Sequence, residues 1–182
     1  MKKIGLVGGT GPESTLMYYK ELNSRIDMLT DGKSMPDIAI ESVNFRRAWD
    51  YVTSGNYDNL AEYLSDKVNS LKKTGAEIIA LTAGTMHIVF DEIENRTGVS
   101  LISIPKAVCD EAVLQGYKKV GLLGTIFTME QDYMKKDYGI EAVILGCTEL
   151  PLLLSSENCV LPCMDSVKIH IQELISLAIN ED

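Results

Sequence analysis

Residues 4–12 read Ile-Gly-Leu-Val-Gly-Gly-Thr-Gly-Pro, a short apolar run that passes directly into a glycine-rich turn and a proline. The run Ile4–Val7 is typical of a buried strand, and the glycines allow a tight turn behind it. Because proline is favoured in the first turn of a helix, the stretch also predicts a helix over Glu13–Met28. The chain therefore opens with the strand–turn–helix order of an α/β protein.

The same alternation of strand and helix patterns continues along the chain. Further strands are predicted at Ile38–Val43, Glu77–Leu81, Leu101–Ile104, Lys119–Leu123 and Ala142–Leu145. Further helices are predicted at Tyr57–Lys73, Lys106–Gln115, Thr128–Lys136 and Val167–Ile179. In the first of these helices Leu60, Leu64 and Val68 recur at helical spacing, and Gly75 marks the expected stop. Alternating elements imply right-handed crossovers and parallel sheets.

Two strand ends carry the same apolar pattern. The segment Ile79-Ala80-Leu81-Thr82-Ala83 matches Val143-Ile144-Leu145-Gly146-Cys147 position by position. The repeat predicts an α/β fold of two pseudo-symmetric lobes, with parallel sheets flanked by helices and strand-end loops facing a shared ligand cleft. We expect a first lobe at residues 1–98 and a second at 99–165, with residues 166–182 as a C-terminal helix packing back on the first lobe.

Composition excludes several classes of partner and site. The chain has 182 residues and a formal net charge of −9, which disfavours binding to nucleic acid or to anionic membrane surfaces. No apolar run approaches the roughly 20 residues that span a bilayer. Four cysteines lack the spacing of a disulfide framework, which predicts reduced thiols and a cytoplasmic location. No motif indicates a metal, a nucleotide or pyridoxal phosphate, so we expect no cofactor.

Cys147 is the strongest candidate for chemistry. It follows a predicted buried strand and Gly146, and it precedes Thr148-Glu149, where a helix is expected to begin. A thiol at a helix N-terminus gains thiolate character from the helix dipole. The alternative is a buried cysteine that acts as a small apolar side chain. Cys109 is expected on the apolar face of its helix, in a structural role.

Polar residues also follow two of the strands predicted in the first lobe. Thr10 and Ser14 stand in the first strand-to-helix turn, where hydroxyl and N–H groups suit a carboxylate; the alternative is a simple helix start. Thr85 is a second candidate for binding a carboxylate. His87 is a candidate acid or a residue that orients a neighbour, although a lone histidine more often has a structural role.

Four segments together resemble the aspartate/glutamate racemase family of cofactor-independent amino-acid racemases. They are Gly8–Thr15, Thr85–His87, Gly121–Thr125 and Leu145–Glu149, and they cover almost the whole chain in order. The resemblance implies an isomerase that acts on a small amino acid such as aspartate or glutamate without pyridoxal phosphate, and a homodimer. It also implies one acid/base from each lobe, facing opposite sides of the substrate Cα.

By this resemblance Cys147 is the acid/base of the second lobe, with Thr82 or a water molecule as its opposite partner. The residues implied in substrate binding are Thr10, Ala83, Gly84, Thr85, Thr125, Thr148 and Glu149.

The sequence also departs from the family pattern. Ala83 stands where the family carries its first cysteine, Gly84 stands for an asparagine, and Ile126 stands for a lysine. About one βα unit, on the order of 30 residues, is missing before Ala142, so we expect a shortened second lobe. These departures leave two alternatives open: a catalytically silent racemase-like binding protein, and a single-cysteine decarboxylase or isomerase of small dicarboxylates.

Overall fold

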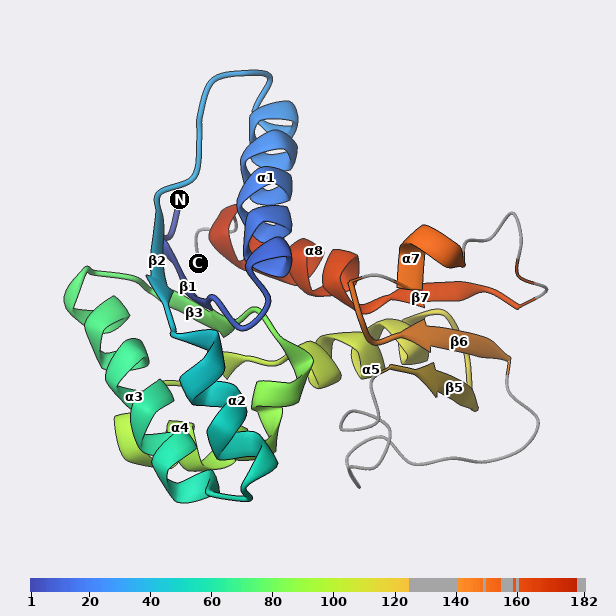
Figure 1. Cartoon of the computed structure of the whole chain (residues 1–182). Helices are drawn as coiled ribbons and strands as arrows, with labels where there is room; N and C mark the ends of the chain where they lie inside the picture. Colours follow the sequence, from blue (N-terminus) through green and yellow to red (C-terminus); the bar gives the residue numbers. More distant parts are fainter. Residues whose placement is uncertain (125–140, 149, 155–158, 160, 180–182) are drawn as a thin grey trace. The chain divides into compact units, whose positions relative to one another are not determined.

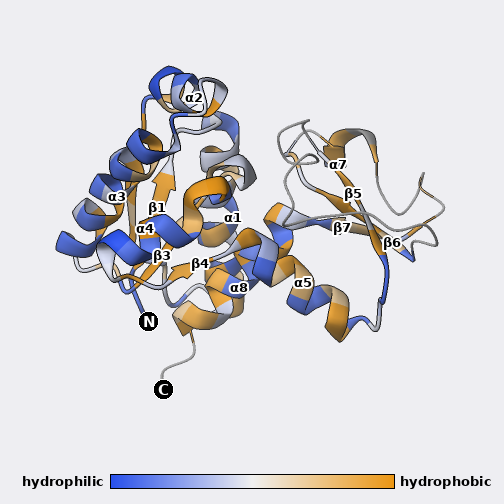
Figure 2. Ribbon diagram, turned by 90° about the horizontal axis from the view of Figure 1, so that it is seen from below, coloured by the Kyte–Doolittle hydropathy of each residue, from blue (hydrophilic) through white to orange (hydrophobic). Residues whose placement is uncertain are grey.

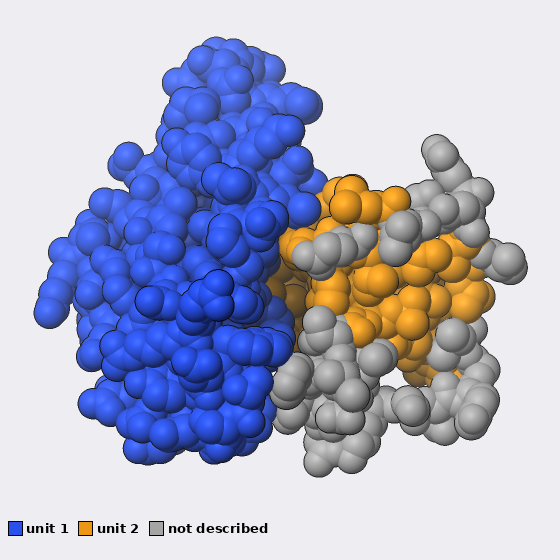
Figure 3. Space-filling view, in the orientation of Figure 1, with its two compact units in different colours: residues 1–102, 174–182 blue, residues 103–173 orange. Residues whose placement is uncertain are grey.

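The computed structural model describes the whole chain except residues 125–140, 149, 155–158, 160 and 180–182 (Figure 1). Its contacts divide the chain into two compact units, coloured separately in Figure 3. Unit 1 comprises Met1–Ile102 and Leu174–Asp182, and unit 2 comprises Ser103–Glu173. Each unit has its own parallel sheet, so the predicted α/β fold with two lobes is confirmed. The lobe boundaries predicted after residues 98 and 165 stay predictions.

Unit 1 contains a four-stranded parallel sheet in the order β2-β1-β3-β4. Its strands are β1 (Ile4–Gly8), β2 (Ile38–Ser42), β3 (Ile78–Leu81) and β4 (Leu101–Ile102). The central strands β1 and β3 are buried along their whole length, which explains why both read as continuous apolar runs. Val7 pairs with Leu81, so the loops that follow these two strands leave the sheet side by side.

Unit 1 contains the last part of α8 (Ser166–Ile179) and a set of helices that lie between its strands in the chain. The helices between the strands are α1 (Pro12–Leu29), α2 (Phe45–Thr53), α3 (Tyr57–Lys73), the 3-10 helix η1 (Gly84–Val89) and α4 (Phe90–Thr97). Both α1 and α3 pack against β1. In α3 the predicted face is fully buried at Leu60, Leu64 and Val68. In Figure 2, β1 is coloured hydrophobic, whereas α3 shows a mostly hydrophilic surface.

Unit 2 contains a parallel sheet in the order β5-β6-β7, with three strands among its described residues. Its elements are α5 (Ile104–Leu114), β5 (Val120–Leu123), β6 (Ala142–Leu145), α7 (Leu150–Leu153), β7 (Cys163–Asp165) and the first part of α8 (Ser166–Ile179). The core of this unit joins side chains of α5 to the sheet. It consists of Ile104, Val108, Ala112, Ala142, Ile144 and Met164.

Several element boundaries differ from those predicted. The strand predicted at Leu101–Ile104 is wrong in its second half, because the Ser103 hydroxyl accepts a hydrogen bond from Lys106 N at 3.3 Å and caps α5. The elements α2, α4 and β7 had no counterpart in the prediction. Of these, α2 buries only Ala48 and Val52, yet Phe45, Ala48, Trp49 and Val52 recur at helical spacing, a signal that sequence reasoning missed. The helix predicted at Thr128–Lys136 lies outside the described residues.

Membrane insertion through a helix finds no support in the part of the chain that the structure describes. Within those ranges no helix combines the length and the apolar character that crossing a bilayer requires.

Candidate active site

The turn after β1 is packed tightly against the segment that follows β2. Gly9 has a φ of +84°, and a Cβ at this position would lie 2.5 Å from Ser42 Oγ and 2.6 Å from the Val43 carbonyl oxygen. The Val43 N–H donates to the Gly8 carbonyl at 2.9 Å. Glycine is therefore required at position 9 both for its backbone conformation and for the close approach of the Val43 backbone. This turn carries Thr10, which is half-buried.

Three hydroxyl groups tie the start of α1 to the end of β3. Ser14 Oγ donates to the Thr82 carbonyl at 2.7 Å, and Thr15 Oγ1 accepts from Gly9 N at 2.9 Å. Thr82 Oγ1 donates to the Val7 carbonyl at 3.2 Å and lies 3.5 Å from Thr15 Oγ1. In this arrangement the Ser14 hydroxyl contacts the backbone of β3. Thr82 is only 1% exposed, so its hydroxyl belongs to the interior of unit 1.

The predicted binding residues of unit 1 lie in the two loops at the carboxyl edge of its sheet. Ala83 is extended, with φ −135° and ψ 130°, and η1 begins at Gly84. Ala83, Gly84 and Thr85 are half-buried, and the Met86 N–H donates to the Ala83 carbonyl at 3.3 Å. Since β1 and β3 are neighbours, the structure places these residues and Thr10 in adjacent loops.

His87 is one of the buried residues of η1. Its ring stacks on Phe90, with the centroids 5.1 Å apart and 8° between the planes. Its Nδ1 lies 3.2 Å from the Ala83 carbonyl oxygen. Burial lowers the pKa of His87 to about 4, against the opposing effect of the Ala83 and Gly84 carbonyls. The imidazole is therefore neutral near pH 7, and its contacts hold η1 against the end of β3.

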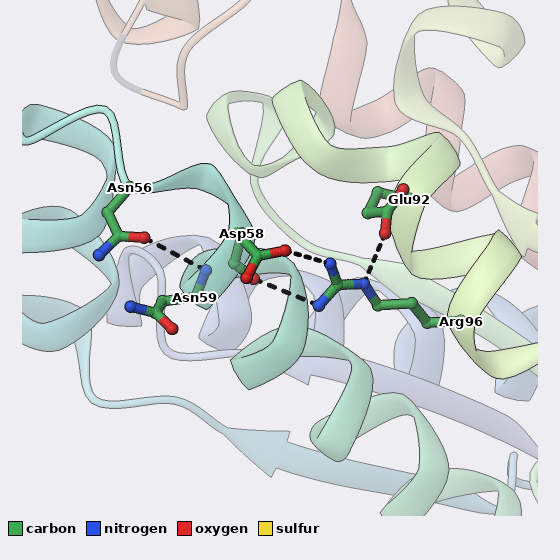
Figure 4. Close-up of polar contacts among 5 residues, drawn as sticks. All are labelled: Asn56, Asp58, Asn59, Glu92 and Arg96. Carbon is green, nitrogen blue, oxygen red and sulfur yellow. Dashed lines mark hydrogen bonds and ion pairs between the residues drawn. The ribbon is translucent and has the colours of Figure 1, made fainter.

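A pocket of about 510 Å³ lies on unit 1 beside η1, lined by parts of η1, α4 and the first turn of α3. Its rim includes the ion-pair cluster of Figure 4, in which Arg96 binds Asp58 at 2.5 Å and Glu92 at 2.6 Å. Asp58 is highly exposed, so solvent screens this contact. The cluster ties α3 to α4. Sequence reasoning missed this pocket because its lining joins the start of α3 to a segment about 30 residues later in the chain.

Cys147 lies in the turn that follows β6 in unit 2. The Gly146 N–H donates to the Leu123 carbonyl at 2.7 Å, which ends the pairing of β6 with β5. Leu150 N then donates to the Cys147 carbonyl at 3.3 Å, where α7 begins. Cys147 and Thr148 are both half-buried. The other two residues predicted for this lobe, Thr125 and Glu149, lie outside the described residues.

Ser166 holds the other side of the same strand end. Its Oγ donates to the Leu145 carbonyl at 2.7 Å, and the side chain is 3% exposed. Asp165 Oδ1 accepts from Val167 N and Lys168 N, both at 3.1 Å, and so caps α8. Sequence reasoning missed Ser166. The only local signal is its place directly after an acidic cap residue.

The remaining cysteines differ in their exposure. Cys109 is exposed on α5, so the prediction that it lies on the apolar face is wrong; that face is formed by Ala107, Val108 and Ala112. Cys159 and Cys163 are half-buried, and burial, together with the Cys159 thiol, raises the pKa of Cys163. Over the described ranges, no group of three or more His, Cys, Asp or Glu side chains is placed to hold a metal ion.

Comparisons with known proteins relate this chain to amino-acid racemases. The family model for Asp/Glu/hydantoin racemases matches residues 7–136. The broad specificity amino-acid racemase RacX of Bacillus subtilis is 26% identical over 136 residues, which cover 73% of this chain and 59% of RacX. The chain thus spans about three fifths of the length of this curated relative.

Two solved structures resemble the chain over nearly its full length. One is a provisionally assigned Asp/Glu racemase from Yersinia pestis, 28% identical with a TM-score of 0.92; the match covers 99% of this chain and 100% of that one. The other is an aspartate racemase homologue from Pyrococcus horikoshii, 32% identical with a TM-score of 0.86, with the same coverage of 99% and 100%.

Proposed function

Because the chain belongs to the Asp/Glu/hydantoin racemase family, we propose that it racemises an acidic amino acid without pyridoxal phosphate, with Cys147 as acid/base. The observation that carries this proposal is the place of Cys147. Its thiol is half-buried in the turn directly after β6, a strand that is buried along its whole length. Ligands of parallel α/β sheets bind at such carboxyl ends.

The proposed chemistry is the transfer of one proton at Cα. The Cys147 thiolate removes the Cα proton, and a second group delivers a proton to the opposite face. Since this C–H bond is very weakly acidic, the site must stabilise the carbanion electrostatically. Thr10, Ala83, Gly84, Thr85, Thr125, Thr148 and Glu149 are the residues that we propose bind the substrate.

The identity of the second proton donor is the least usual part of the proposal. Ala83 has no exchangeable side-chain proton, which leaves Thr82 or a water molecule. Thr82 Oγ1 already donates to the Val7 carbonyl, and the residue is 1% exposed. Thr82 would have to give up this hydrogen bond to reach a substrate, so the geometry favours water.

Proton NMR in D2O tests the proposal. L- and D-aspartate and L- and D-glutamate are each incubated with the protein, beside a Cys147→Ser variant. Because RacX is a broad specificity racemase, alanine, lysine and arginine complete the panel. We expect loss of the Cα proton signal and appearance of the other enantiomer, both dependent on Cys147.

Other outcomes separate the alternatives. Exchange without inversion means that only one face is served, as in a single-cysteine decarboxylase or isomerase of small dicarboxylates. No exchange with any substrate excludes a racemase of these amino acids. Saturation-transfer binding without exchange would then support the silent binding protein, which the alanine at position 83 favours.

Thiol reactivity tests the acid/base assignment of Cys147 independently of substrate. Cys109 is exposed and Cys147 is half-buried, so accessibility alone predicts faster alkylation of Cys109. We expect iodoacetamide to modify Cys147 faster near neutral pH, because an acid/base thiol is partly ionised there. Peptide mass spectrometry gives both rates from one sample. A slower reaction at Cys147 would contradict an activated thiolate.

A further inference from the structure

Both units share one arrangement around the strand that precedes the predicted acid/base position. In unit 1, β3 ends before Ala83 and pairs with β1; in unit 2, β6 ends before Cys147 and pairs with β7. In each case the helix after the neighbouring strand supplies a buried serine from its first turn. Ser14 of α1 donates to the Thr82 carbonyl and Ser166 of α8 to the Leu145 carbonyl, both at 2.7 Å.

In unit 2 these contacts act on a single peptide group. The peptide between Leu145 and Gly146 has its carbonyl bound by Ser166 Oγ and its N–H bound to the Leu123 carbonyl, also at 2.7 Å. It is therefore held from both sides. Cys147 directly follows Gly146, so a single glycine separates this peptide from the thiol-bearing residue. Gly146 itself has no side chain to restrict its dihedral angles.

The Ser166 hydroxyl is not needed to cap its own helix. Asp165 Oδ1 already accepts from Val167 N and Lys168 N at the start of α8. The hydroxyl donates instead to Leu145 at the end of β6, 21 residues away in the sequence. Ser166 is only 3% exposed, so this hydrogen bond is buried. A buried hydrogen bond of this kind restricts the carbonyl that accepts it.

We propose that Ser166 is a positioning residue that sets the orientation of the Cys147 thiol by holding the Leu145–Gly146 peptide. The inference rests on the proposed function in so far as Cys147 is its acid/base. The Ser14–Thr82 contact is the corresponding restraint in unit 1, displaced by one residue along the strand end.

The test measures alkylation of Cys147 by iodoacetamide against pH in the full chain, with Cys109 as internal reference. In Ser166→Ala either the limiting alkylation rate of Cys147 or its apparent pKa should change. The alkylation rate near pH 7 should therefore change by about threefold or more. Ser166→Thr, which retains the hydroxyl, should stay within about twofold of the parent. Cys109 should keep its rate in both variants.

Ser103→Ala is the matched control, since Ser103 caps another helix of unit 2 and its hydroxyl accepts a hydrogen bond from Lys106 N. It should leave the profile of Cys147 unchanged. If Ser166→Ala does not fold, Ser166→Cys takes its place, with a weaker donor of similar size, and should shift the profile in the same direction. An unchanged profile in the folded variant overturns the proposal.

Cα exchange in D2O separates this proposal from the proposed function. If the parent catalyses exchange, Ser166→Ala should lower kcat by about tenfold with KM nearly constant. A fall in activity with an unchanged thiol profile would overturn the positioning role. If the parent shows no exchange but the profile shifts, the control of Cys147 by Ser166 holds and the racemase assignment fails.

Discussion

At the scale of single residues, two buried polar side chains of unit 1 differ in their hydrogen bonding. His87 is buried with its Nδ1 at a carbonyl oxygen and its ring on Phe90. Ser65 is 5% exposed on α3, and its hydroxyl has no hydrogen-bond partner among the residues described. Burial therefore links the protonation of His87 to stability, whereas the Ser65 hydroxyl can be removed without loss of a hydrogen bond.

His87 should make stability depend on pH. Its pKa of about 4 in the folded protein lies below the ordinary 6.5, so the unfolded chain binds the proton first as pH falls. The free energy of unfolding therefore falls as the pH drops from about 6.5 toward 4, by up to about 3 kcal/mol. Above about pH 6.5 this loss is absent. Urea unfolding of the parent and His87→Phe at about pH 7.5 and pH 5 checks this. Equal pH dependence in both proteins would contradict it.

Ser65→Ala should be neutral or stabilising. Removing a buried hydroxyl that lacks a partner should raise the free energy of unfolding by up to about 1 kcal/mol. Ser14→Ala is the matched comparison, because its hydroxyl donates to the Thr82 carbonyl, and it should lower the same free energy by about 1–3 kcal/mol. Urea titration measures both. Similar losses in the two variants would show that Ser65 has a partner.

At the scale of elements, the strand-to-helix turns place the predicted site residues. The turn after β1 closely approaches the chain leaving β2, and the turn after β3 passes directly into η1. A Cβ added at Gly75, in the turn that follows α3, would instead lie in open space. Gly9 and Gly75 thus have similar φ angles but different surroundings, so comparing them separates the effect of packing from that of backbone strain.

Gly9→Ala should be far more damaging than Gly75→Ala. Their φ angles are +84° and +81°, so both variants carry the left-handed strain of about 1–2 kcal/mol. At position 9 the new Cβ also meets Ser42 Oγ at 2.5 Å, whereas at position 75 nothing lies within 4 Å. We expect a further loss of about 2 kcal/mol for Gly9→Ala. Equal thermal midpoints would show that the turn relaxes freely.

At the scale of the whole molecule, the proposed reaction needs two acid/base groups. We propose Cys147 of unit 2 as one of them, and the corresponding position of unit 1 holds Ala83 in an extended, half-buried loop. The two units thus carry the same strand-end architecture with different chemistry. The proposal of a water molecule as the second donor follows from this difference.

Restoring the missing group should raise activity. Ala83→Cys with Gly84→Asn introduces the thiol and amide typical of the family, and racemisation should rise by about tenfold or more if the missing base limits the rate. The same double change with Cys147→Ser is the control and should show no inversion. Polarimetry of L- and D-aspartate measures the rate. An unchanged rate would mean that a feature other than position 83 limits turnover.

Local pattern was sufficient for the elements whose apolar residues repeat within a single segment. The helix over Tyr57–Lys73 and the strand over Ala142–Leu145 were predicted with the bounds that the structure has. The same reasoning placed Cys147 in a turn after a buried strand. It missed α2, although its apolar residues recur at helical spacing, and it failed at Ser103, where capping outweighed the strand pattern.

The sequence alone thus determined the α/β class, the alternation of elements and the strand-end place of Cys147, because these depend on periodicity within a few neighbouring residues. Only the tertiary structure decided the orientation of Thr82, the exposure of Cys109 and the lowered pKa of His87. It also decided the partners of the two serines, since Ser14 and Thr82 are 68 residues apart and Ser166 and Leu145 are 21 apart. Burial and hydrogen bonding between distant segments exist only once the sheets have formed.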